Sequence, residues 1–336
     1  MEESTTPIDQ TPTQPAPAPT APKKKLPVRA LVVAGIIVLA LGALAALLFI
    51  RFDGFTLAER VAAQAELRGI MVADRSFESI APQSFGLMKL MPHEVAGVSG
   101  TLGDYATGGK VEAVIVRSAE GASEVWLLGT EPRVLASGTA AKAALAISAD
   151  GSFVAYAART DGSAAFAPYK SGWTVHLIEL ESGRDIELGS GFDPEFFVRD
   201  GVSYLLFTTA DSIVVNSLAD TASIAGFITP FELSDAIDHT ARISPNGMHL
   251  ALKDPATRQY TIYSVYRVAA GMPLGLEPHA NPATRYTDII FTNDAAYGID
   301  NLTQGSASVW KISLGGEAIE TKRYTFTTQY PNRFIR

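Results

Sequence analysis

The sequence predicts an all-β fold, a β-propeller, and two recurring features carry that prediction. One is a tight corner that joins two short apolar runs, and the other is an apolar strand pattern that follows each corner. The corner returns at intervals of 46 to 50 residues along the second half of the chain. A fixed period of this length is typical of propellers and solenoids, in which each repeat is one supersecondary unit.

The corner is clearest at residues 148–151, which read SADG. Aspartate bonds its own backbone in a turn and glycine accepts a positive φ, while the alternation in residues 153–157 (FVAYA) favours a strand after the corner. Related corners follow at residues 198–201 (VRDG), 244–247 (SPNG) and 292–295 (TNDA). We therefore expect a β-hairpin at each of these places.

The second recurring feature is a strand pattern in which an Ile or Val is followed by a large side chain. It occurs at residues 125–128 (VWLL), 175–178 (VHLI), 213–216 (IVVN), 262–265 (IYSV) and 309–312 (VWKI). The second position is aromatic in three of these five runs, as expected where one large side chain per unit packs between neighbouring sheets. The pattern predicts that Trp126 and Trp310 are equivalent core residues.

Five repeat units can be counted in the sequence, at residues 94–137, 140–189, 192–230, 238–278 and 284–325. A ring of such sheets hides the strand edges that would otherwise promote aggregation. Residues 69–90 and 323–335 would together supply a sixth, divergent blade that closes the ring. Six blades are expected, with five as the alternative.

An uncharged run of 21 residues, 30–50, precedes the repeats and is long enough to cross a bilayer core of roughly 30 Å as a helix. Lys23, Lys24, Lys25 and Arg29 lie before it, whereas only Arg51 follows directly, so the positive-inside rule places the N-terminus in the cytoplasm and the C-terminal domain outside. The alternative is a cleaved signal peptide, because Ala43 and Ala45 form an A-x-A pattern.

Four parts of the chain are therefore predicted. Residues 1–29 form a proline-rich, disordered cytoplasmic tail, residues 30–50 a transmembrane helix, residues 51–68 a stalk or linker, and residues 69–336 the propeller domain. The chain has a net charge of −8 and no cysteine. An acidic chain of this kind argues against nucleic-acid binding, and without disulfides the domain depends on its core for stability.

The corners SADG and SPNG, each followed by a short strand (FVAYA, HLAL) and later by the Ile/Val-aromatic run, resemble the WD40-like repeats of TolB-type propellers and of propeller domains in some peptidases. The resemblance covers residues 94–325 in degenerate form. Ala149 replaces the proline that is usual in this corner, Val198 and Arg199 replace Ser-Pro, and Ala295 replaces glycine. Because the motif defines blade corners, it implies the fold and no particular site.

Few patterns in the sequence point to catalysis or metal binding. The chain has no Gly-x-Ser-x-Gly motif, and His93-Glu94 begins a zinc motif that Gly97 breaks at its fifth position. His239 and His249 flank a corner and are interpreted as parts of a solvated hairpin rather than as metal ligands. No cofactor and no metal ion are predicted.

Carboxylates offer a second route to catalysis, since some propellers are glycosidases with two acids beside the channel. The candidates are Asp104, Asp150, Asp200 and Asp294. Three of these four lie in the repeated turn, where backbone hydrogen bonding alone explains an aspartate. A degenerate glycosidase or lyase with channel carboxylates is therefore the alternative.

The favoured function is a membrane-anchored extracytoplasmic propeller that acts as a binding or scaffold module for a protein or an envelope polymer. Packing occupies the strands, so recognition is expected to use the loops at the ends of the ring and the mouth of its channel. Two long insertions are the candidate contact loops: residues 160–172, with Phe166 and Tyr169, and residues 269–286, with Tyr286.

Overall fold

The computed structural model describes two helices and a series of four-stranded sheets. The described residues are 28–49, 56–67, 70–73, 77–82, 88–92, 95, 98–117, 122–159, 172–209, 212–219, 226–230, 240–254, 257–269, 272–292, 295–303, 306–315, 320–327 and 333–335. The chain divides into two compact units, residues 1–57 and residues 58–336.

The first unit contains helix α1 (Val28–Phe49), whose apolar side chains are extensively exposed. Leu39, for example, is 75% exposed and Ile36 is 61% exposed. Within the part of the chain that the structure describes, no helix is both long enough and apolar enough to span a membrane.

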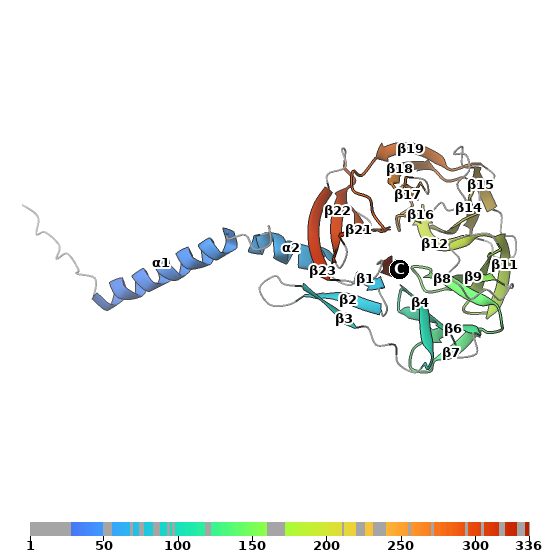
Figure 1. The fold of residues 1–336 in the computed structure, drawn as a ribbon, viewed down its shortest axis with the longest axis horizontal. Coiled ribbons are helices and arrows are strands. Elements are labelled where there is room, and N and C mark those ends of the chain that lie inside the picture. The colour runs from blue at the N-terminus through green and yellow to red at the C-terminus, as the bar shows by residue number, and fades with distance from the viewer. Residues whose placement is uncertain are drawn as a thin grey trace, which may run out of the picture. The chain divides into compact units, whose positions relative to one another are not determined.

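The second unit is an all-β propeller, as the sequence predicted (Figure 1). Five blades are each built from a contiguous stretch of chain, in which four antiparallel strands follow one another. The strands are β4 (Thr101–Gly108), β5 (Val111–Arg117), β6 (Ser123–Leu128) and β7 (Arg133–Ala136); β8 (Ala141–Ile147), β9 (Phe153–Arg159), β10 (Thr174–Glu179) and β11 (Arg184–Ser190); β12 (Phe192–Arg199), β13 (Val202–Thr208), β14 (Ser212–Ser217) and β15 (Gly226–Pro230); β16 (Thr240–Ile243), β17 (His249–Lys253), β18 (Tyr260–Arg267) and β19 (Gly275–Ala280); and β20 (Asp288–Phe291), β21 (Ala295–Thr303), β22 (Ser306–Ser313) and β23 (Glu320–Thr327).

A further four-stranded sheet combines the two ends of the domain. Strand β24 (Arg333–Ile335) pairs with β1 (Met71–Ala73), which is followed outward by β2 (Phe77–Pro82) and β3 (Met88–Pro92). The first strands of consecutive blades contact one another, and β24 contacts both β20 and β4. In Figure 1 these first strands lie around the centre of the ring and the fourth strands lie at its rim.

Three of the predicted corners lie wholly within the described residues, and they are built in two ways. At residues 148–151 the Ser148 hydroxyl donates to Asp150 Oδ1 (2.6 Å) and accepts from the backbone N–H of Phe153 (2.9 Å). Ser244 makes the equivalent pair of bonds in the corner at residues 244–247. At residues 198–201, Asp200 and Gly201 instead have φ values of 52° and 76° and form a two-residue hairpin loop between paired Arg199 and Val202.

The second repeat pattern marks a recurrent β-bulge in the third strand. The register of the third and fourth strands shifts between Val125 and Trp126, and the same shift recurs at Val175/His176, Ile262/Tyr263 and Val309/Trp310. The residue before the bulge is completely buried in each case, whereas Trp126 and Trp310 are only partly buried. The expectation that these two tryptophans occupy equivalent positions is confirmed, but the core residue of the repeat is the aliphatic one before them.

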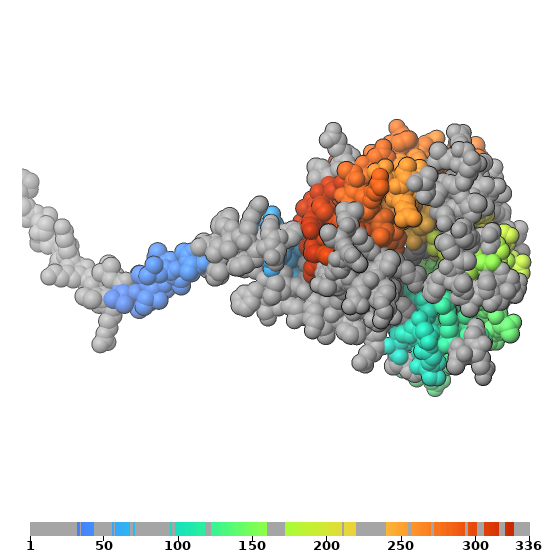
Figure 2. Space-filling model, in the orientation of Figure 1, coloured from blue at the N-terminus to red at the C-terminus, as the bar shows by residue number. Residues whose placement is uncertain are grey.

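Helix α2 (Leu57–Leu67) packs on the last contiguous blade of the second unit. Leu67 and Ile70 join the apolar cluster of Tyr297, Ile299 and Val309. Beside them Glu66 bonds Lys311 Nζ at 2.8 Å and lies 3.0 Å from Arg323 Nε. The described surfaces of this blade and of blade β4–β7 are visible at the rim of the ring in Figure 2, in red and teal.

Candidate functional site in the channel of the propeller

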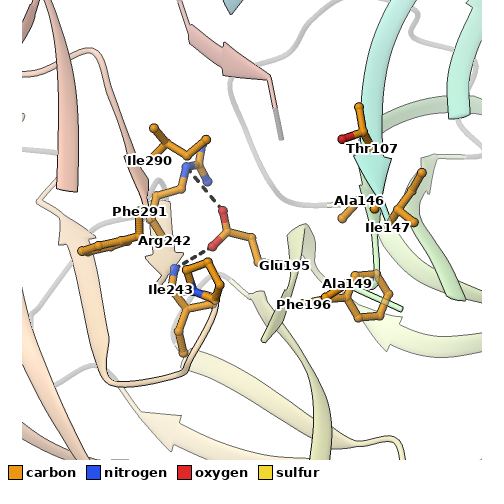
Figure 3. A pocket seen from close by; sticks show the side chains of 12 residues that line it. Thr107, Ala146, Ile147, Ala149, Glu195, Phe196, Arg242, Ile243, Ile290 and Phe291 are labelled. Atoms are coloured by element: carbon orange, nitrogen blue, oxygen red, sulfur yellow. Dashed lines mark hydrogen bonds and ion pairs between the residues drawn. The ribbon is translucent and has the colours of Figure 1, made fainter. Parts of the chain in front are cut away.

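A pocket of about 230 Å³ opens where the first strands of all five contiguous blades meet (Figure 3). Its lining is mostly apolar and includes Ile147, Phe196, Ile243, Ile290 and Phe291. The residues come from β4, β8, β12, β16 and β20, apart from two corner residues, Ala149 and Pro245. A concave apolar pocket with few polar groups is the usual form of a binding site in a protein, although this one is small.

The polar side of the pocket is formed by Arg242 and Glu195, which are 8% and 7% exposed. Glu195 Oε2 accepts the backbone N–H of Ile243 at 2.6 Å, and its Oε1 lies 3.7 Å from Arg242 Nε. Figure 3 shows the Glu195 carboxylate between the Arg242 side chain and Ile243, with Ala146 and Ile147 across the pocket. The one charged pair in this lining is therefore held in a fixed geometry.

Arg242 lies at the centre of a buried charge cluster that joins three blades. Its Nε donates to Asp288 Oδ1 at 2.9 Å, and its Nη1 lies 3.6 Å from Asp193 Oδ2. Burial alone would lower the pKa of Arg242, but the neighbouring carboxylates, with Asp288 first among them, raise it well above its ordinary value. The guanidinium therefore remains charged and links β12, β16 and β20.

The cluster contains a second cation, Lys253, whose Nζ donates to the carbonyl oxygen of Thr287 at 2.9 Å. Burial lowers the pKa of Lys253, and the charge of Asp288 partly opposes that effect. Three carboxylates thus share two cations in a desolvated place. Removing one partner from such a network is costly, because it leaves an uncompensated charge buried away from water.

Asp104 belongs to a related contact between neighbouring blades rather than to the pocket. Its Oδ2 accepts the backbone N–H of Leu145 on the next blade at 3.1 Å, and its Oδ1 accepts the N–H of Tyr105 at 2.9 Å. In the same way, the Glu195 carboxylate on β12 accepts the backbone N–H of Ile243 on the following blade. Acidic side chains on the first strands therefore act as clamps between blades along the channel.

Asp150 and Asp200, two of the other predicted acids, do not line the channel pocket. Asp150 is held in its corner by bonds from Ser148 and from the backbone N–H of Ser152, and although burial acts in the opposite direction these bonds lower its pKa. Asp200 occupies the two-residue loop after β12. Asp294 lies outside the described residues. The carboxylates that do converge are Asp193, Glu195 and Asp288, which the sequence analysis did not select.

The predicted contact residues divide between described and undescribed parts of the chain. Phe166 and Tyr169 lie outside the described residues. Tyr286 is 2% exposed, its ring lies directly against Gly298, and its hydroxyl donates to Glu320. Burial, followed by this carboxylate, raises the pKa of the Tyr286 hydroxyl. Tyr286 is therefore a core residue and not an exposed contact residue, because its ring belongs to the apolar cluster formed between blades β16–β19 and β20–β23.

The described histidines, His176, His249 and His279, do not line the channel pocket. His176 stacks on Tyr156 with ring centroids 5.0 Å apart and bonds Asp185 at 3.1 Å, so it packs against side chains of its own blade. His249 lies beside His279, with a centroid distance of 5.3 Å, whereas His239 is outside the described residues. Among the described residues there is no group of three or more potential metal ligands.

Sequence reasoning missed Arg242 and its acids because none of them belongs to the repeated corners. One signal was available, since Arg242 stands between Ala241 and Ile243 in the strand just before the SPNG corner. A charged residue in a buried strand requires partners of opposite charge. The sequence does not indicate which acids those partners are, because they come from residues 46 to 49 positions away.

Comparisons with known proteins found similar solved structures of low identity but no family. No protein-family model matches the chain, and no curated protein matches it. Similar solved structures include TolB from Acinetobacter baumannii (12% identity, TM-score 0.46, covering 79% of this chain and 65% of that one) and the β-propeller domain of Cps50 (Swd1) from Myceliophteria thermophila (11%, 0.41, 69% and 88%). Another is an acylaminoacyl peptidase from Pyrococcus horikoshii (9%, 0.42, 78% and 47%). The chain thus spans less than two thirds of the TolB structure.

Proposed function

We propose that this chain is a membrane-anchored, extracytoplasmic propeller that acts as a binding or scaffold module, with the channel pocket as its recognition site. The observation that carries the proposal is the convergence of five blades on one apolar pocket with a fixed Glu195–Arg242 pair at its wall. A pocket of about 230 Å³ accommodates one or two side chains of a partner and not a folded domain. The expected partner is therefore a protein or envelope polymer that inserts a short projecting group.

Site-specific photo-crosslinking tests this assignment. Thr107 is exposed and lines the pocket, so a benzoylphenylalanine at position 107 should form a discrete adduct in native membranes. The same group at Arg133, which is exposed on the outer strand β7, serves as the matched control. If positions 107 and 133 gave identical adducts, the pocket would not be the recognition site.

The membrane anchor in this proposal is supported by the sequence. Residues 30–50 carry no charge, three lysines and one arginine precede them, and the helix over this region exposes its apolar side chains. Exposed apolar surface of this extent is unfavourable in water and favourable in hydrocarbon. Protease added to intact, wall-stripped cells should digest the propeller or release it from the membrane, and complete protection until lysis would reverse the orientation.

We also propose that the sheet β24-β1-β2-β3 serves as a sixth blade that closes the ring. Its support is the contact of β24 with the first strands β4 and β20 on either side. Pairing strands from both ends of a chain is a common way to lock such a ring. Deletion of residues 331–336 should therefore lower the melting temperature far more than deletion of residues 1–6, and equal melting temperatures would contradict this role.

A glycosidase or lyase is the second candidate, and one observation favours it. Glu195 and Asp288 both contact Arg242 Nε, so two carboxylates do converge beside the pocket as such an enzyme requires. Binding is preferred because both carboxylates are engaged by Arg242 and by backbone N–H groups. Release of reducing ends from envelope polysaccharides by the full chain, lost in Glu195→Gln, would establish the enzyme instead.

A further inference from the structure

A second surface, which shares no residue with the lining of the channel pocket, has the composition of a protein interface. It lies at one end of blade β16–β19, where Tyr266, Arg267, Met272 and Pro273 lie at the connection between the third and fourth strands and Met248 lies just before the second strand. The backbone N–H of Val265 donates to the carbonyl oxygen of Met248 and joins these two parts. We call these five residues the β18–β19 patch. Tyr266 is 62% exposed, Met248 48% and Met272 47%. These are the three most exposed large apolar residues that the structure describes in the propeller strands and their connections. Tyrosine, methionine and arginine are residue types enriched in interface cores.

The backbone presents Tyr266 outward by a specific device. Strands β18 and β19 pair Val265 with Leu276 and Arg267 with Gly275, which leaves Tyr266 at a register shift between the two pairs. A bulge of this kind re-aims the side chain of the extra residue. The Tyr266 ring then lies over Gly275, where a Cβ atom would come within 2.5 Å of it. The exposed position of Tyr266 is therefore built into the strand pairing.

Other blades show that the fold does not need apolar side chains here. The bond from the N–H of Val265 to the carbonyl of Met248 has counterparts from Leu180 to Ser152 and from Leu218 to Ser203, which aligns the three blades. The residues equivalent to Met248 are serines, and those equivalent to Tyr266 are Glu181 and Ala219. Of these three blades, only blade β16–β19 carries exposed Met and Tyr side chains at these positions, where the other two have small or polar residues.

Arg267 supplies the charge of the patch. Its guanidinium lies 5.9 Å from the centre of the Tyr266 ring, and its Nη2 has a long contact of 3.4 Å with the carbonyl oxygen of Pro273. The Nε atom is buried and has no hydrogen-bond partner, and Arg267 forms no ion pair with any described residue. The Arg267 guanidinium therefore has no carboxylate partner among the described residues and lies beside apolar side chains. A guanidinium in this setting is complementary to an acidic group.

We propose that the β18–β19 patch is a docking site for a protein segment that combines apolar side chains with a carboxylate. The apolar side chains cover Tyr266, Met248 and Met272, and the carboxylate bonds the Arg267 guanidinium. A segment of this chemistry satisfies both features of the patch, whereas an uncharged apolar segment would leave Arg267 unpaired. This site is separate from the channel pocket and does not depend on it.

The test uses the full chain in nanodiscs of zwitterionic lipid, panned against a library of random 12-residue peptides. Enriched peptides should contain Asp or Glu close to Leu, Phe or Trp. In fluorescence anisotropy, Tyr266→Ser and Arg267→Ala should each weaken their binding about tenfold or more. Arg267→Glu should transfer the preference to peptides in which Lys replaces the acid. Because Tyr266 and Arg267 lie at the surface edge of the blade, the melting temperature of each variant checks that folding is intact.

Matched controls locate the binding. Glu181→Ala, at the position of blade β8–β11 that is equivalent to Tyr266, and Thr107→Trp, which fills the channel pocket, should leave peptide affinity unchanged. The proposal would be overturned if no peptides were enriched, or if Tyr266→Ser and Arg267→Ala left the affinity for the enriched peptides unchanged. Two other results would also overturn it. If Tyr266→Ser or Arg267→Ala abolished self-association of the chain, the occupant would be a second copy. If either substitution abolished binding to vesicles containing phosphatidylglycerol, the occupant would be a membrane.

Discussion

Replacement of Arg242 by methionine is the sharpest test of the channel cluster. Methionine keeps much of the aliphatic volume of the side chain but removes the cation that Asp193, Glu195 and Asp288 share. Arg242 is 8% exposed, so water cannot take over its role without opening the junction of three blades. Lys253 then remains as the cation of the cluster, with its own bond to Thr287.

The expected loss follows from the physics of broken buried ion pairs. Removing one partner leaves uncompensated buried charge, which typically costs about 3 to 5 kcal/mol of the free energy of unfolding. Arg133→Met, on an exposed strand, should change it by no more than about 0.5 kcal/mol. Urea denaturation of the full chain in detergent, followed by tryptophan fluorescence, compares the transition midpoints at constant slope.

A second substitution separates charge from packing. If the loss is electrostatic, Asp288→Asn in the Arg242→Met background should recover at least about 1 kcal/mol, because it removes one of the unpaired charges. Additive losses in the double variant would show that packing dominates. A midpoint for Arg242→Met that matches the parent would refute the view that this cluster holds the three blades together.

Three further outcomes are expected. Gly298→Ala should destabilise the domain by about 1 to 3 kcal/mol, because its Cβ would overlap the Tyr286 ring, whereas Gly315→Ala, with open space around it, should be neutral in the same thermal melts. Burial, aided by the neighbouring His279, lowers the pKa of His249, so the unfolded chain takes up a proton first as the pH falls. Stability should therefore decrease below about pH 6.5, and this decrease should be smaller in His249→Phe; an identical pH profile would contradict the assignment. Ser148→Ala loses the corner bonds to Asp150 and Phe153 and should cost about 1 to 2 kcal/mol in urea denaturation, unlike Ser182→Ala in an exposed turn.

Local chemistry accounts for the parts of the fold that could be predicted. Ser148, Asp150 and Gly151 specify a corner through bonds within a few residues of one another, so the corner is legible wherever these residue types recur. The Val-Trp and Val-His pairs could be recognised as a repeat for the same reason. The β-bulge that they mark could not be predicted, because a bulge depends on the pairing of two strands, and the sequence of one strand does not show how its partner pairs with it.

The candidate site depends on relations that the sequence cannot show. Asp104 was selected for its recurrence and turned out to clamp the next blade, whereas Glu195 and Asp288 follow no repeat and meet at Arg242 across blade boundaries. Tyr286 was expected at the surface because it belongs to an insertion that is long relative to the repeat, yet its ring fills the space that Gly298 leaves open.

The sequence by itself determined the all-β repeat, the places of the corners and the five contiguous units, because short-range hydrogen bonding and the alternation of apolar residues specify them. Only the tertiary structure decided which charges share a cluster, which aromatic residues are buried and where the first strands enclose a pocket. Those outcomes depend on side chains that are some 46 residues apart in the chain and that meet only when neighbouring blades pack. Burial then makes their pairing obligatory, because a charge removed from water is stable only beside its partner.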